Sequence, residues 1–132
     1  MEKYELYING RWEKPSSGAY FDSDNPYNGE IWAQIARGNE KDVDFAVKAA
    51  SNAFEDHWEP MKPTERGKIL VRLAELIERE APRLGKIEVK DNGKLFAEMG
   101  AQTKYLAEWY RYFGGLADKV EGSVIPIDKP GM

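Results

Sequence analysis

Residues 24–54 read DNPYNGEIWAQIARGNEKDVDFAVKAASNAF, and they place a turn, an extended segment and a helix in one stretch. Asn25-Pro26 and Asn28-Gly29 indicate the turn, because both dipeptides favour chain reversal. Glu30–Ala36 then alternates in the manner of a strand. Asn39 is a suitable helix N-cap. After it, apolar residues recur at helical spacing: Val43, Ala46, Val47, Ala50 and Phe54. The stretch therefore predicts a strand that leads directly into an amphipathic helix, which ends near residues 57–60.

The residues before this stretch predict a β-hairpin and a further short strand. Tyr4–Ile8 alternates between apolar and polar residues, and Asn9-Gly10 is a strong signal for a tight hairpin turn. Arg11–Glu13 would be the returning strand, and Ala19–Phe21 could resume extended structure after a loop.

The residues after it predict three more helices and a last strand. Thr64 is expected to cap the first of them, whose apolar face comprises Ile69, Leu70, Leu73, Leu76 and Ile77. Pro82 is expected to begin a short helix of its own, since the first helical turn has no N–H partner to lose. Gly93 would end it in a left-handed conformation. The last helix is expected over Phe96–Lys119, and a strand over Val124–Ile127.

The helix over residues 96–119 carries apolar side chains on two sides. One stripe comprises Phe96, Met99, Thr103, Leu106, Tyr110, Phe113 and Ala117. The opposite side carries Ala101, Tyr105, Trp109 and Tyr112. A helix that is apolar on both sides usually has neighbours on both sides. With few strands and an abrupt C-terminus, the sequence predicts an incomplete core and a chain that stops before its fold is complete.

Composition narrows the classes of function. The chain has 132 residues and a net charge of −4, with 19 basic and 23 acidic side chains. A nucleic-acid-binding protein needs a cationic surface, so this balance argues against such a partner. The absence of cysteine removes disulfides, thiolate metal sites and cysteine nucleophiles. No stretch approaches the roughly 20 apolar residues of a membrane span. We expect a soluble, cytoplasmic chain with neither nucleic acid nor membrane as a partner.

Several polar or glycine-containing motifs have a plain structural interpretation. Gly114-Gly115 lacks the surroundings of a phosphate-binding loop and favours close helix approach. His57 has no second ligand at metal spacing and reads as a surface residue. One set of charges predicts a solvated helix face with i, i+4 ion pairs: Glu75, Glu78, Glu80, Arg72, Arg79 and Arg83. No catalytic and no cofactor-binding residue is assigned within the chain.

Taken in order along the chain, five segments resemble the N-terminal part of the aldehyde dehydrogenase superfamily. These segments are YINGRW, the stretch over residues 24–54, PTERGKILVRLAELIER, DNGK, and RYFGGLADKVEGSVIPID. No single segment is as specific as a metal-binding motif, but their common order and spacing make coincidence improbable.

The resemblance implies an α/β parent fold, of which this chain would be an α+β fragment with an N-terminal hairpin and short strands, about four helices and a C-terminal strand. The family oxidises an aldehyde to a carboxylic acid with NAD or NADP, through a thioester on a catalytic cysteine, with a glutamate as base. Those residues would follow Met132. The fragment alone is expected to be inactive and to bind no cofactor, while the parent would be a homodimer or homotetramer.

The resemblance also implies two sites. Ala101, Tyr105 and Trp109 would line the channel through which the aldehyde enters, although ordinary helix packing explains the two aromatic residues equally well. Some family members bind a structural monovalent cation, and here the corresponding residues would be Ser23, Asp24 and Asp91. Asp91 can equally be a turn residue.

Three regions are expected along the chain: strands and turns at the edge of the cofactor domain or in an oligomerisation region (1–36), the helical part of the cofactor-binding domain (37–121), and the start of a strand (122–132). An alternative from a different class stays open, a non-enzymatic helical module that binds a protein partner. Its contact residues would be the aromatic side chains of Trp58, Tyr105, Trp109 and Tyr112.

Overall fold

The computed structural model describes residues 1–124 and 126. Its elements in chain order are β1 (Glu2–Tyr4), β2 (Leu6–Ile8), β3 (Arg11–Glu13), β4 (Tyr20–Asp24), β5 (Ile31–Ala36), α1 (Glu40–Ala53), the π-helical turn η1 (Phe54–Trp58), α2 (Pro63–Asn92) and α3 (Phe96–Leu116). Short strands followed by helices confirm the predicted α+β arrangement. The described residues hold three α-helices where about four were predicted.

The strands form two small sheets. β2 and β3 pair antiparallel, and the turn between them places Asn9 at φ 51° and Gly10 at φ 79°. This left-handed pair confirms the predicted hairpin turn. β5 pairs parallel with β1 and antiparallel with β4, which gives the order β1-β5-β4. The segment predicted as one strand over Tyr4–Ile8 is therefore divided at Glu5 between the two sheets.

The start of α1 is held by a reciprocal cap. The side chain of Asn39 accepts hydrogen bonds from the backbone N–H groups of Lys41 and Asp42, and the Asp42 carboxylate accepts one from the Asn39 N–H at 2.9 Å. The same carboxylate accepts the backbone N–H of Ser16 at 3.0 Å, which ties the loop before β4 to the helix. These bonds satisfy N–H groups that have no partner within the helix, and they confirm Asn39 as the N-cap.

The helix α2 corrects two predictions. Pro82 does not begin a new helix but lies inside one that runs from Pro63 to Asn92. A proline in a helix interior costs about 3 kcal/mol, so packing must offset that cost. Ala81 and Gly85 on either side of it are buried, and the Thr103 hydroxyl lies 3.2 Å from the Ala81 carbonyl oxygen.

The ends of the helices differ in detail from expectation. The N-cap of α2 is Lys62 rather than Thr64. Gly93 caps its C-terminus at φ 72°, as predicted. α3 ends at Leu116 instead of Lys119. The strand predicted at 124–127 includes residues 125 and 127, which lie outside the described part of the chain. Within that part, no helix combines the length and apolar character that crossing a membrane requires.

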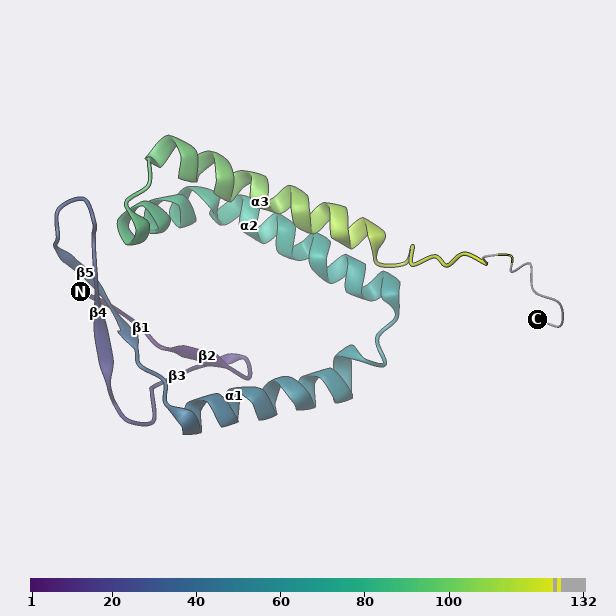
Figure 1. Cartoon of the computed structure of the whole chain (residues 1–132), viewed down its shortest axis with the longest axis horizontal. Helices are drawn as coiled ribbons and strands as arrows, with labels where there is room; N and C mark the ends of the chain where they lie inside the picture. The colour runs from purple at the N-terminus through teal and green to yellow at the C-terminus, as the bar shows by residue number, and fades with distance from the viewer. Residues whose placement is uncertain (125, 127–132) are drawn as a thin grey trace.

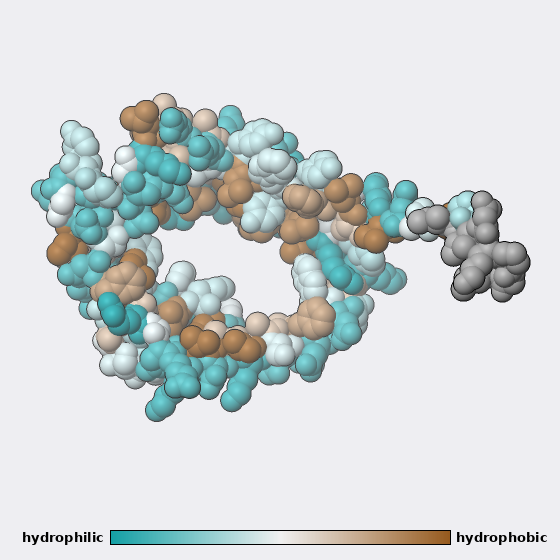
Figure 2. Space-filling model, in the orientation of Figure 1, coloured by the Kyte–Doolittle hydropathy of each residue, from teal (hydrophilic) through white to brown (hydrophobic). Residues whose placement is uncertain are grey.

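Figure 1 shows that the chain forms an open ring, with the sheets at one end, α1 along one side and the α2–α3 hairpin along the other. The space-filling view retains the opening at the centre (Figure 2). The buried hydrophobic residues are few and mostly small: Ile8, Ala33, Ala36, Ala74, Ala81, Met99 and Ala107. More than half of them lie where α2 meets α3, so this hairpin contains the main core.

Candidate functional site

The contact between α2 and α3 is made by small residues and determines which face of α3 stays free. Gly67 and Gly114 approach so closely that a Cβ built on Gly67 would lie 2.5 Å from the Gly114 carbonyl oxygen. Further along, a Cβ on Gly85 would lie 3.4 Å from the Gly100 backbone. Met99, at the buried side of α3, is 2% exposed. Side chains on the opposite side of α3 therefore project away from α2.

That opposite side of α3 carries a continuous aromatic surface. The rings of Tyr105 and Trp109 meet edge to face at 6.1 Å between centroids, and Trp109 stacks on Phe113 at 6.5 Å. Tyr112 meets Phe113 edge to face at 5.3 Å. Tyr105 is 60% exposed and Trp109 53%. The aromatic residues stabilise one another, but this chain does not cover them.

The three residues predicted to line a channel do lie together. Ala101, Tyr105 and Trp109 line one open hollow of about 500 Å³ on the outer side of α3. Gln102 and Leu106 complete this hollow, and the sequence analysis did not assign either to a site. The spacing of Leu106 from Tyr105 and Trp109 on the helix was the available signal.

The predicted division of α3 into two apolar stripes was partly wrong. Leu106 and Phe113 were assigned to the stripe that would pack against a neighbouring helix, yet they are 41% and 55% exposed. The buried residues of α3 are Met99, Ala107 and Gly114. Glycine and alanine allow the two backbones to approach closely, and larger side chains are displaced to the outer side.

The predicted cation residues come from two separate elements. Ser23 on β4 donates its hydroxyl to Asp91 Oδ1 at 2.8 Å, close to the end of α2. Asp24 ends β4 at a register shift in the ladder with β5. Gly93 packs on the turn that follows β4, since a Cβ there would lie 3.1 Å from Pro26.

This pair offers oxygen donors of the kind that hard cations prefer, with one carboxylate. Among the described residues no group of three or more His, Asp or Glu side chains gathers as a metal centre would need.

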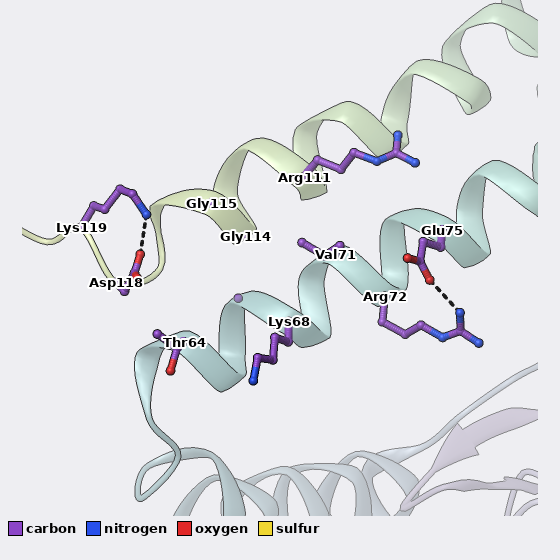
Figure 3. A pocket seen from close by; sticks show the side chains of 11 residues that line it. Thr64, Lys68, Val71, Arg72, Glu75, Arg111, Gly114, Gly115, Asp118 and Lys119 are labelled. Atoms are coloured by element: carbon purple, nitrogen blue, oxygen red, sulfur yellow. Dashed lines mark hydrogen bonds and ion pairs between the residues drawn. The ribbon is translucent and has the colours of Figure 1, made fainter.

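A second hollow, of about 420 Å³, lies between the start of α2 and the end of α3 (Figure 3). Its basic side chains are held by neighbouring acids: Arg72 pairs with Glu75 at 2.7 Å, and Lys119 with Asp118 at 2.6 Å. Cations that are already paired offer little to an anionic ligand. Gly114 in its wall confirms the prediction of close helix approach, whereas a Cβ on Gly115 would meet nothing within 4 Å.

The predicted charged face of α2 exists, but its pairs are spaced i, i+3. Glu78 is an exception, because it accepts a hydrogen bond from Arg111 of α3. That bond lowers the pKa of the Glu78 carboxyl, with the positive charge of Arg111 as the next cause. Arg111 also donates to Glu108 at 2.5 Å, and the pKa of its guanidinium is raised, chiefly by Glu78. His57 is exposed at the end of η1, as expected.

We predict that this pair makes the hairpin sensitive to acid. A carboxyl whose pKa is lowered on folding stabilises the fold above its unfolded pKa, about 4.3 for glutamate, and this contribution disappears as the pH falls through the folded pKa. Arg111→Met should flatten the loss of stability below about pH 4.3, as measured by urea unfolding followed with circular dichroism. Lys86→Met, at an exposed position on α2, is the control. Equal acid slopes in both variants would contradict the prediction.

Comparison with known proteins identifies the class to which this fold belongs. The family model described as "Aldehyde dehydrogenase family" matches residues 12–132. The chain therefore belongs to the aldehyde dehydrogenase family.

Individual relatives agree with this assignment. The chain is 49% identical to (Z)-2-((N-methylformamido)methylene)-5-hydroxybutyrolactone dehydrogenase of Acinetobacter baylyi over 100% of its own length and 27% of that protein. It is 41% identical to a mitochondrial aldehyde dehydrogenase of Rattus norvegicus, over 94% of this chain and 24% of that one. The chain thus spans about a quarter of the length of the curated relatives it matches.

Solved structures show the same fold. HpcC from Thermus thermophilus superimposes with a TM-score of 0.89 at 34% identity, over 96% of this chain and 25% of that one. PnpE in complex with nicotinamide adenine dinucleotide superimposes with a TM-score of 0.86 at 39% identity, over 95% of this chain and 26% of that one. In both cases the ring corresponds to one quarter of a much larger chain.

Proposed function

We propose that this chain is the N-terminal part of an NAD(P)-dependent aldehyde dehydrogenase, which oxidises an aldehyde to a carboxylic acid through a cysteine thioester. The observation that carries the proposal is the family match over residues 12–132 by a chain that spans only a quarter of its relatives. The 132 residues contain no cysteine, so the nucleophile and the base would come from residues beyond them.

The isolated chain would then have no dehydrogenase activity and would hold no cofactor. The complex of PnpE with a nicotinamide dinucleotide supports a nicotinamide cofactor for the parent protein. We leave the choice between NAD and NADP to the assay below, because the ribose contacts that decide it would lie elsewhere in the parent.

Within the parent, the aromatic surface of α3 would form one wall of the aldehyde channel. Ala101, Tyr105 and Trp109 share one hollow, and they project away from the helix that buries the other side of α3. Rigid aromatic rings give a channel apolar area at little cost in conformational entropy. The neutral Gln102 amide adds a polar group that can accept or donate a hydrogen bond.

The remaining assignments complete the proposal. A structural monovalent cation would lie at Ser23, Asp24 and Asp91. The parent would be a cytoplasmic homodimer or homotetramer, with residues 1–36 at the edge of the cofactor domain or in the oligomerisation region, residues 37–121 in the cofactor domain and residues 122–132 beginning a strand.

The substrate class can be narrowed through the relative from Acinetobacter baylyi, whose printed substrate is a substituted 5-hydroxybutyrolactone. A lactone with a hydroxyl on the carbon next to the ring oxygen is the closed form of an aldehyde that also carries a carboxylate. We therefore propose small aldehyde acids and their ring-closed hydroxylactones as the first substrates to examine.

The test is an assay of the protein encoded by the whole reading frame that contains these residues. Purified full-length protein should form NADH or NADPH when given such an aldehyde acid, and residues 1–132 alone should form none. A reading frame that closes directly after Met132, or a full-length protein inactive towards a broad panel of aldehydes with both cofactors, would overturn the proposal.

One observation favours the alternative of a binding module. Trp58, Tyr105, Trp109 and Tyr112 are all exposed, at 36–61%. A module of that kind needs a self-sufficient core, however, and the buried residues here are mainly alanines. Sharp, concentration-independent unfolding of residues 1–132 alone would favour it.

A further inference from the structure

The helix α1 borders the central opening without burying any residue. It is 14 residues long and amphipathic, yet none of its side chains is buried. Val43 and Val47, on its predicted apolar face, are 58% and 62% exposed. Most helical stability in proteins comes from packing an apolar face, so a helix capped this well but packed so little lacks a neighbour.

The opposite wall of the opening is apolar as well. An open hollow of about 660 Å³ on α2 is lined by Met61, Glu65, Lys68, Ile69, Arg72, Leu73 and Leu76. Leu76 lies about half a turn around the helix from Gly67, which faces α3. The side of α2 away from α3 faces α1 across the opening (Figure 1). Hydrophobic residues border the opening over both helices in Figure 2.

The amount of exposed surface indicates how large the missing neighbour is. The accessible surface of the chain is 10441 Å² for a mass of 15.1 kDa. A compact monomer of that mass exposes about 7,100 Å², so the excess is roughly 3,300 Å². The exposed residues 118–124 account for part of it. The rest is on the scale of one side of a large obligate interface, roughly 1,000–2,500 Å².

We propose that the opening between α1 and α2 is the seat of an apolar segment from the downstream part of the same full-length chain. This inference rests on the proposed function. Its occupant is indicated by the solved chains, since the open ring superimposes on one quarter of each with TM-scores up to 0.89. The ring therefore has the shape that its counterparts adopt beside three quarters of additional chain. A second copy of the ring has no matching convex body to insert.

The lining indicates the chemistry of the segment. Ala46, Ala49, Ala50 and Ala53 line a shallow groove of about 440 Å³ between α1 and the β2–β3 turn. Alanine side chains let a neighbouring backbone approach closely and leave room for its larger side chains. The facing wall of α2 supplies branched aliphatic residues. A segment rich in Val, Leu or Ile fits between these walls, and a charged segment does not.

Hydrogen–deuterium exchange of the full-length protein tests the proposal directly. The amides of α1 should exchange at least about 100-fold more slowly than an unstructured peptide, because opening would require removal of the packed segment. Exchange within tenfold of the unstructured rate would overturn the proposal. Protection that rises with protein concentration would assign the opening to a second copy and would overturn it as well.

A matched pair of variants locates the contact on α1. Ala50 and Ser51 are both small and exposed in this chain, but Ala50 lines the groove, and Ser51 is turned about 100° away around the helix. Ala50→Arg should lower the protection of α1 at least tenfold in the full-length protein, and Ser51→Arg should leave it within twofold. If Ala50→Arg does not yield folded protein while Ser51→Arg does, the same contact is indicated. Equal protection in both variants would overturn the proposal.

Aldehyde oxidation by the wild-type full-length protein is scored separately. Activity without protection of α1 would reject the occupied opening and retain the enzyme. Protection without activity towards any aldehyde would do the reverse.

Discussion

Replacing Gly67 with alanine is expected to separate α2 from α3 and to lower the stability of the protein by roughly 2–3 kcal/mol. The added Cβ would lie 2.5 Å from the Gly114 carbonyl oxygen and 3.3 Å from the Ala117 Cβ. A backbone carbonyl cannot rotate away as a long side chain can, so the helices must move apart along their whole contact. The better helix propensity of alanine, about 1 kcal/mol, offsets only part of this cost.

The measurement is urea unfolding followed by circular dichroism, with Gly115→Ala as the control. A Cβ on Gly115 would meet nothing within 4 Å, so that variant should gain about 0.5–1 kcal/mol from helix propensity alone. Opposite signs for two glycine-to-alanine changes in the same helix pair would identify the close approach. A Gly67→Ala variant as stable as the wild type would show that the crossing is not as tight as described.

Substituting Tyr105 by alanine in the full-length enzyme is expected to lower kcat/KM for the aldehyde about 10- to 100-fold. The ring is 60% exposed in this chain and lines the outer hollow of α3 beside Ala101 and Trp109. If the hollow is part of the channel, removing the ring takes away apolar contact with the substrate and lets water enter. The measurement is initial rates of NAD(P)H formation over a range of aldehyde concentrations.

Tyr27→Ala is the control for that experiment. Tyr27 is 91% exposed on the turn between β4 and β5, and it does not line the hollow. Its removal should leave kcat/KM unchanged. If Tyr105→Ala keeps full activity while the protein remains folded, Tyr105 has no channel role and ordinary packing against another element explains its position.

Where local chemistry decides the structure, the sequence was sufficient. The Asn9-Gly10 hairpin turn, the Asn39 cap and the left-handed Gly93 are each determined by a few neighbouring residues, and all three were predicted correctly. The aromatic residues of the candidate channel could also be grouped from helical spacing, since Ala101, Tyr105 and Trp109 recur every fourth residue.

Where distant residues decide, prediction failed. Pro82 reads locally as a helix start, but α3 packs along the flanking Ala81 and Gly85 and keeps α2 continuous. Phe113 reads as a packing residue, but the close approach of Gly67 and Gly114 leaves no space for it between the helices. Both errors come from tertiary contacts that no short window of sequence contains.

The open ring has a consequence for the order in which the protein forms. Proteins are synthesised from the N-terminus, and contacts close in sequence form sooner than distant ones. The α2–α3 hairpin joins neighbouring segments across a short connection, so it can assemble while later residues are still being translated. The apolar face of α1 has to wait for its neighbour. During that interval the nascent chain exposes Val43 and Val47, which makes α1 the segment where a chaperone would bind first and where aggregation would begin.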